Sequence, residues 1–240
     1  MAILAFAYAL VAYLGFLLVS VYAIGFVGGF VVPKTIDGPQ TFSLVQAIAI
    51  DLGLVLLFGV QHSVMARQRF KRLWVRWIPE SIERSTYVVC SSLALAACFY
   101  FWRPIAGALW EVPPPWSGVL WGGYALGWLV LMLSSFMISH AELFGLKQAW
   151  LALCRRPMQA QPFRIRWLYK LVRHPIMLGF LMTFWLTPVM SLGHLVFSMG
   201  MTAYILIGLY FEEKDLVAAI GDDYLAYQAQ VPKLLPWTRQ

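Results

Sequence analysis

Long apolar stretches constrain this chain more than any other feature. Four of them lie at about residues 3–32, 44–65, 86–102 and 118–140. Each is long enough to cross a bilayer as a helix, which takes about 20 mostly apolar residues. Charged residues make up 12% of the chain, about half of the ~25% that is typical of soluble proteins. We therefore expect an all-α integral membrane protein.

A fifth apolar stretch, at about residues 177–211, is too long for one crossing. It is interrupted by Thr187-Pro188 and by Gly193, and a proline and a glycine this close together favour a helical hairpin. The predicted fold has four transmembrane helices plus this hairpin, which makes five to six spans. The first stretch lacks a cationic leader and a small-residue cleavage site, so we expect a retained helix and not a signal peptide.

The positive charges indicate the orientation of these spans. Of the 18 Lys and Arg residues, six lie between the second and third stretches, seven between the fourth stretch and the hairpin, and three after the hairpin. Lys34 and Arg103 remain for the opposite side. The positive-inside rule then predicts a multi-pass protein of the inner (cytoplasmic) membrane with both termini in the cytoplasm.

The net charge of +7 thus reflects topology. We expect the lipid bilayer as a partner, with no nucleic acid and no obligate protein partner. The three cysteines (Cys90, Cys98 and Cys154) do not have the spacing of metal ligands, so no metal site is expected.

Polar residues that the loop charges do not explain collect at four helix ends on the predicted cytoplasmic side. They are Gln61-His62-Ser63, Glu83 to Tyr87, His140 with Glu142 to Gln148, and Arg173-His174-Pro175 followed by Gly179, Glu212-Glu213, Gly221, Tyr224 and Tyr227. Four clusters on one side predict the walls of a pocket that opens to cytoplasm and lipid. Each member also has a plainer interpretation, because interfacial histidines often only donate hydrogen bonds and tyrosines form membrane-interface belts.

The last 70 residues carry a combined motif. Arg173-His174-Pro175 to Gly179, the apolar hairpin, Glu212-Glu213, Tyr224 and Tyr227 resemble the cofactor half of the isoprenylcysteine carboxyl methyltransferase superfamily, whose members are membrane enzymes that use S-adenosylmethionine. Gln61 to Arg67, Glu83 to Tyr87 and His140 to Gln148 are similar to its bacterial methanethiol S-methyltransferase branch. The chain departs from the family at Met177, where an aromatic residue is usual, and at Gln68, where proline is usual.

This resemblance implies that S-adenosylmethionine binds at the cytoplasmic end of the hairpin. Pro175 would break the chain before the helix, and Gly179 would let the cofactor approach closely. Glu213, with Glu212, is expected to hold the amino group of the cofactor or offset its sulfonium charge. We expect Glu213→Gln to weaken cofactor binding without unfolding the protein. The remaining cofactor-binding residues would be Arg173, His174, Tyr224 and Tyr227.

The resemblance also implies a small volatile thiol, methanethiol, as the acceptor. A thiol must lose its proton before it attacks, and His140 is the first choice of base because one helix face would carry it with Phe136 and Phe144 at i−4 and i+4. His62 is the alternative base. Arg84 would stabilise the thiolate, with Tyr87 and Ser85 as hydrogen-bond donors.

The predicted organisation is one membrane domain, 1–240, with the acceptor side in residues 1–150 and the cofactor side in residues 165–240. Two alternatives remain open. A related methyltransferase could act on a larger lipid or prenyl thiol, and a redox protein of another class could hold a haem between His62 and His140.

Overall fold

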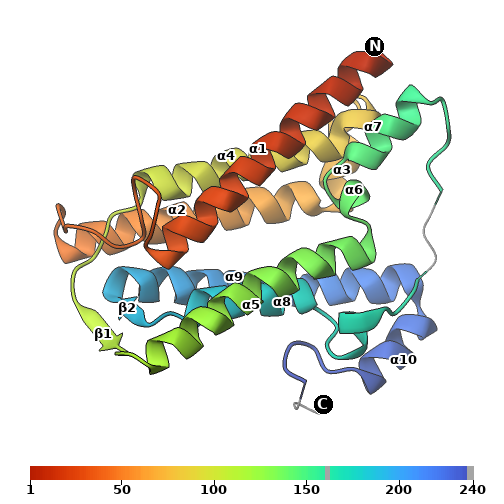
Figure 1. Ribbon diagram of the computed structural model, residues 1–240. Helices are drawn as coiled ribbons and strands as arrows, with labels where there is room; N and C mark the ends of the chain where they lie inside the picture. The colour runs from red at the N-terminus through yellow and green to blue at the C-terminus, as the bar shows by residue number, and fades with distance from the viewer. Residues whose placement is uncertain (160–162, 237–240) are drawn as a thin grey trace. The chain divides into compact units, whose positions relative to one another are not determined.

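The computed structural model describes residues 1–159 and 163–236, and these are mostly helical (Figure 1). In chain order the elements are α1 (Ala2–Gly28), α2 (Leu44–Ala66), α3 (Gln68–Trp74), α4 (Glu80–Phe101), β1 (Ala108–Glu111), α5 (Trp116–Ile138), α6 (His140–Leu143), α7 (Leu146–Leu153), the 3-10 helix η1 (Trp167–Lys170), α8 (Pro175–Trp185), β2 (Val189–Ser191), α9 (Leu192–Ile220) and α10 (Asp222–Gln230).

Five of the described helices are long and apolar enough to cross a membrane: α1, α2, α4, α5 and α9. Large apolar side chains on them are exposed, for example Leu18 at 72% and Leu56 and Leu93 at 65% each. Apolar side chains exposed all around a helix are stable in lipid and not in water. The structure therefore confirms a helical chain suited to multiple membrane spans.

The hairpin differs from its prediction. Its first arm, α8, has 11 residues and is about 16 Å long, about half the hydrocarbon thickness. The chain then leaves the helix, bends at Pro188 and enters β2, which pairs with β1. The second arm, α9, has 29 residues and runs on to Ile220. Glu212 and Glu213 therefore lie within a helix and not at its end, so that expectation was wrong.

The described chain divides into two compact units. The first contains residues 1–107, 139–159 and 191–197, and the second contains residues 108–138, 163–190 and 198–236. In the first unit, α1 packs on α4 and α7, and α2 packs on α4. In the second unit, α5 packs on α8. Each unit thus combines segments that are far apart in the sequence, and α5 belongs with α8.

Two glycines let α5 and α8 approach closely. A Cβ on Gly179 would lie 2.7 Å from the Gly127 carbonyl oxygen and 2.9 Å from the Leu131 nitrogen, both backbone atoms. A Cβ on Gly127 would lie 2.9 Å from the Gly179 carbonyl oxygen. Small residues at a helix contact are common in membrane proteins because backbones can then touch. Gly179 therefore lets α8 pack closely on α5. The close approach that we expected of the cofactor at Gly179 is made in the structure by α5.

We expect Gly127→Ala to lower the free energy of unfolding by about 1–3 kcal/mol, because overpacking against backbone forces the helices apart. Gly122→Ala on the same helix is the matched control, since nothing lies within 4 Å of its added Cβ. The control should be neutral or up to about 1 kcal/mol more stable. Thermal unfolding in detergent compares the two variants, and equal stabilities would contradict this account of the packing.

Candidate active site

The first unit contains a hydrogen-bonded cluster around His62 of α2 and Tyr87 of α4. Tyr87 Oη lies 2.7 Å from His62 Nε2, and Ser91 Oγ lies 3.1 Å from His62 Nδ1. The Arg84 guanidinium, one turn before Tyr87, lies 4.9 Å from the centroid of the Tyr87 ring. Arg84 Nε also donates to the Leu143 carbonyl at 2.7 Å. A cation, a phenol and an imidazole therefore share one cluster.

His140 contacts the aromatic side chains of Tyr13 and Phe144 in the same unit. Its Nε2 lies 2.8 Å from Tyr13 Oη, and its ring centroid lies 4.7 Å from that of Phe144. Phe144 stacks on Phe16 of α1 with ring centroids 4.0 Å apart. Burial lowers the pKa of His140 below its ordinary value, so the imidazole is neutral at pH 7. A neutral imidazole can take a proton from an acid.

The structure does not put Phe136 and His140 on one helix. α5 ends at Ile138, and His140 begins a separate short helix, α6, after the extended backbone of Ser139. The prediction of a continuous face through Phe136, His140 and Phe144 was therefore wrong, although His140 and Phe144 still contact each other. Ser139 is the N-cap residue of α6, and its backbone lies outside the helical region (φ 170°, ψ 90°), which separates the two helices.

Ser85 lies against the turn that precedes α7. It is fully buried, and its Oγ has no hydrogen-bond partner among the described residues. Gly145 has φ +88°, and a Cβ there would overlap Ser85 Oγ and lie 2.7 Å from its nitrogen. Only glycine fits this backbone conformation next to α4. Few buried hydroxyl groups in proteins lack a hydrogen-bond partner, which makes Ser85 unusual.

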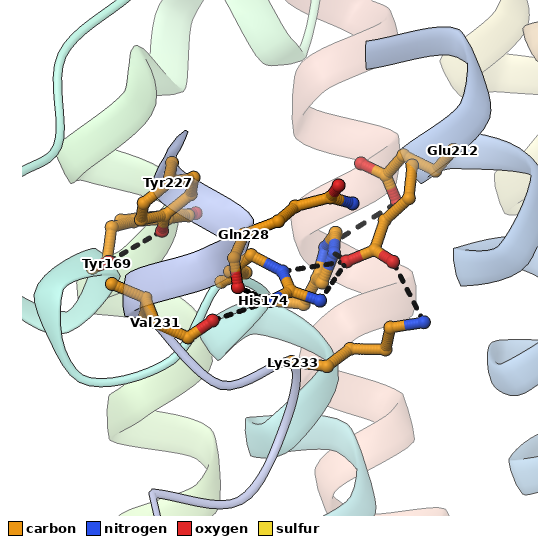
Figure 2. Close-up of polar contacts among 9 residues, drawn as sticks. Tyr169, His174, Glu212, Tyr227, Gln228, Val231 and Lys233 are labelled. Carbon is orange, nitrogen blue, oxygen red and sulfur yellow. Dashed lines mark hydrogen bonds and ion pairs between the residues drawn. The ribbon is translucent and has the colours of Figure 1, made fainter. Parts of the chain in front are cut away.

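The second unit holds a buried ionic network around Glu213 of α9 (Figure 2). Glu213 Oε1 lies 2.8 Å from both Nε and Nη2 of Arg173 and 3.1 Å from His174 Nε2. Glu213 Oε2 lies 2.8 Å from Lys233 Nζ. The carboxylate therefore already has three basic partners. Buried charges are stable when paired in this way.

Arg173 and His174 also bind the segment after α10. The Arg173 backbone N–H donates to the Pro232 carbonyl at 2.9 Å, and that of His174 donates to the Lys233 carbonyl at 3.1 Å. Arg173 Nη1 donates to the Val231 carbonyl near the end of α10 at 2.5 Å. Pro175 is the first residue of α8, as predicted. This ladder places Lys233 beside Glu213, a contact that the sequence motif did not indicate.

Tyr224 and Tyr227 are buried on α10, three residues apart as predicted. Tyr227 Oη donates to the Tyr169 carbonyl at 2.6 Å, and Phe163 packs edge-on against both α10 rings. Burial raises the pKa of Tyr227 to about 12 and also raises that of Tyr224, where the Glu213 charge adds to the effect. Both phenols therefore stay protonated and act as neutral walls or donors.

A pocket of about 350 Å³ lies beside this network. Its lining residues are Tyr210, Glu213, Lys214, Val217, Gln228 and Lys233. Glu212 is 49% exposed, and its carboxylate lies 3.9 Å from His174 Nδ1. The pocket has the size of a small-molecule site and presents an acid, two bases and an amide.

The predicted site residues fall into the two units. The first contains His62, Arg84, Ser85, Tyr87, His140 and Phe144, and the second contains Phe136, Arg173, His174, Pro175, Gly179, Glu212, Glu213, Tyr224 and Tyr227. Sequence reasoning missed Tyr13, Phe16 and Lys233, which reach these clusters from distant parts of the chain. Within residues 1–159 and 163–236, His, Cys, Asp and Glu form no group of three that could hold a metal.

Comparison with known proteins decides the family. The chain is 50% identical over 231 residues to a methanethiol S-methyltransferase of Mycobacterium tuberculosis, which covers 96% of this chain and 95% of that protein. It is 48% identical over 229 residues to methanethiol S-methyltransferase 2 of Bradyrhizobium diazoefficiens, covering 95% and 88%. The chain belongs to the methanethiol S-methyltransferase family.

Membership in this family confirms the resemblance predicted from the motifs. The chain is also 31% identical over 186 residues to human nurim, a match that covers 74% of this chain and 71% of nurim. No protein-family model and no solved structure matches the chain. The match to the Mycobacterium tuberculosis protein covers 96% of this chain and therefore most of both compact units.

Proposed function

We propose that this protein transfers the methyl group of S-adenosylmethionine to methanethiol, giving dimethyl sulfide and S-adenosylhomocysteine. The observation that carries this proposal is the 50% identity to a methanethiol S-methyltransferase over 96% of the chain. The residues of both units fit the chemistry. When bound, S-adenosylmethionine supplies an electrophilic methyl carbon on a positively charged sulfur.

The residues of the second unit fit the cofactor. S-adenosylmethionine carries an ammonium, a carboxylate, a sulfonium and an adenosine, and the pocket beside Glu213 offers carboxylate, lysine and amide groups in about 350 Å³. Tyr224 and Tyr227 would bound the cofactor on the α10 side. Glu212 is the more exposed carboxylate and would offset the sulfonium charge. On α10, Gln228 lines the pocket itself, whereas Tyr224 and Tyr227 lie on the same helix against Phe163.

The first unit would activate the thiol. In the tautomer with its proton on Nε2, His140 donates that proton to Tyr13 Oη, so Nδ1 carries the lone pair that takes the thiol proton. The thiol S–H bond breaks, the new S–CH₃ bond forms, and the bond from that methyl carbon to the sulfonium sulfur breaks. Arg84 would stabilise the thiolate as a fixed cation. His62 remains the alternative base, with Tyr87 and Ser91 on its two ring nitrogens.

We also propose that both termini lie in the cytoplasm. The sixteen-to-two distribution of Lys and Arg supports this orientation. The short α8 followed by the segment that leads to β2 would complete a sixth crossing. A reporter fused to the carboxy terminus should be active on the cytoplasmic side, and activity on the outer side would exclude this topology.

The test of the function is direct. Purified protein in lipid nanodiscs, given methanethiol and S-adenosylmethionine, should produce dimethyl sulfide in the headspace, and absence of product would overturn the proposal. An apolar pocket discriminates by only about 1–3 kcal/mol per methylene, so ethanethiol should be a slow substrate. A preference for prenyl thiols would instead favour the larger-thiol alternative. A Soret band in the purified protein would favour the haem alternative.

A further inference from the structure

Two lysines line the pocket of the second unit, and they contact different groups. Lys233 Nζ lies 2.8 Å from Glu213 Oε2, and the Lys233 side chain is 32% exposed. Lys214 Nζ lies over the Tyr210 ring, 4.3 Å from its centroid. Lys233 is therefore the pocket lysine that is paired with a buried carboxylate and still reachable by a ligand.

Glu213 divides its two oxygens between different partners. Oε1 binds Arg173 and His174, whereas Oε2 binds Lys233. The Arg173 side chain is 1% exposed, and it also donates to carbonyls of Gln228 and Val231, so it cannot turn toward a ligand. If Lys233 moves away, Arg173 still compensates the charge of Glu213. Lys233 is thus the partner that can be exchanged.

An α-amino acid carries an ammonium and a carboxylate on one carbon. This pair of charges is complementary to Glu213 Oε2 and Lys233 Nζ, which already lie in contact in the pocket. We propose that Lys233 binds the carboxylate of the amino-acid end of the cofactor, while the ammonium takes the place of Lys233 beside Glu213 Oε2. This inference rests on the proposed use of S-adenosylmethionine and adds the residue that recognises its carboxylate.

If the cofactor ammonium replaces Lys233 beside Glu213, the effect of removing Lys233 should depend on whether the ligand carries a carboxylate. Two probes are compared in nanodiscs by calorimetry: S-adenosylhomocysteine, and S-adenosyl-3-thiopropylamine, which keeps the amine and lacks the carboxylate. Lys233→Met should weaken binding of the first about 10- to 100-fold, which is the range of a charge-assisted hydrogen bond. Binding of the second should be unchanged or tighter, because its ammonium no longer has to displace Lys233 from Glu213. Lys233→Arg should restore part of the lost affinity because it keeps the charge.

Lys170→Met is the control, since it removes the same charge from an exposed lysine of the second unit that is not among the residues lining the pocket. It should leave both affinities unchanged. If Lys233→Met weakened the binding of both probes equally, the role of Lys233 would be structural and the inference would be overturned. Unchanged binding of both probes would also overturn the inference. If Lys233→Met unfolds, the wild-type protein still decides, because equal affinity for the two probes would exclude any carboxylate subsite. Failure of the wild type to bind S-adenosylhomocysteine at all would instead overturn the proposed function together with this subsite.

Discussion

Glu213→Gln is expected to lower the free energy of unfolding by about 3–5 kcal/mol, the range for breaking a buried ion pair. The substitution keeps the shape of the side chain and removes its charge. Arg173, whose side chain is 1% exposed, would then be buried without its anion. Unfolding by SDS in mixed micelles, followed by circular dichroism, measures the change. This loss of stability is expected in addition to the weaker cofactor binding that the proposed role of Glu213 predicts for Glu213→Gln.

The neighbouring residue provides the control for this prediction. Glu212 carries the same charge on the same helix, but its side chain is 49% exposed. Glu212→Gln should therefore change stability by no more than about 0.5 kcal/mol. If Glu213→Gln were as stable as wild type, the network would not contribute to folding and the buried contacts of Arg173 would need another explanation.

His140→Ala is expected to lower turnover of methanethiol about 10²- to 10⁴-fold, the usual loss when a general base is removed. Binding of S-adenosylhomocysteine should stay nearly intact, because the Glu213 network lies in the other compact unit. Headspace analysis of dimethyl sulfide at saturating cofactor gives the rate, and calorimetry gives the affinity. Turnover of the variant should rise at high pH, where more of the thiol ionises without a base.

The pH profile follows from the direction of the His140 shift. Burial favours the neutral ring, so the pKa of His140 lies below its ordinary value. The base is neutral and active above that pKa, and it becomes protonated and inactive as the pH falls through it. Wild-type turnover should therefore persist below pH 6.5 and fall on further acidification. Turnover of His140→Ala should instead fall steadily over the whole range below the pKa of the thiol, because it depends on the ionised fraction of the thiol alone.

His62→Ala separates the two candidate bases. If His62→Ala abolishes turnover while His140→Ala does not, the base is His62, with Tyr87 as its hydrogen-bond partner. If neither variant is impaired, thiolate formation depends on Arg84 and the electrostatics of its cluster. Tyr13→Phe is a milder test of the first assignment, because it removes the partner of His140 Nε2 and keeps the ring.

The local sequence pattern was sufficient to predict some features of the site. Pro175 begins α8 as predicted, because proline is favoured in the first turn of a helix. Tyr224 and Tyr227 share a buried face of α10, because residues three apart lie on one side of a helix. The contact of Arg84 with Tyr87 follows from the same spacing on α4.

Long-range contacts could not be predicted in this way. Tyr13 and His140 are 127 residues apart and Arg173 and Glu213 are 40 apart, and no local periodicity indicates either pair. The role of Gly179 depends on Gly127, a residue on another helix. Hydropathy also could not show that His140 lies outside α5, because the expected stretch ran to about residue 140, whereas α5 ends at Ile138 and His140 begins α6.

The sequence by itself determined that the chain is a multi-span helical membrane protein, and its motifs determined the family. Both follow from properties that can be read directly along the sequence: the length of the apolar stretches, the charge between spans and the spacing of motifs. The tertiary structure decided which charges compensate each other, and it showed that Glu213 is enclosed by Arg173, His174 and Lys233. Ion pairing depends on distance in space and on burial, and neither quantity exists until the helices and the carboxy-terminal segment have packed.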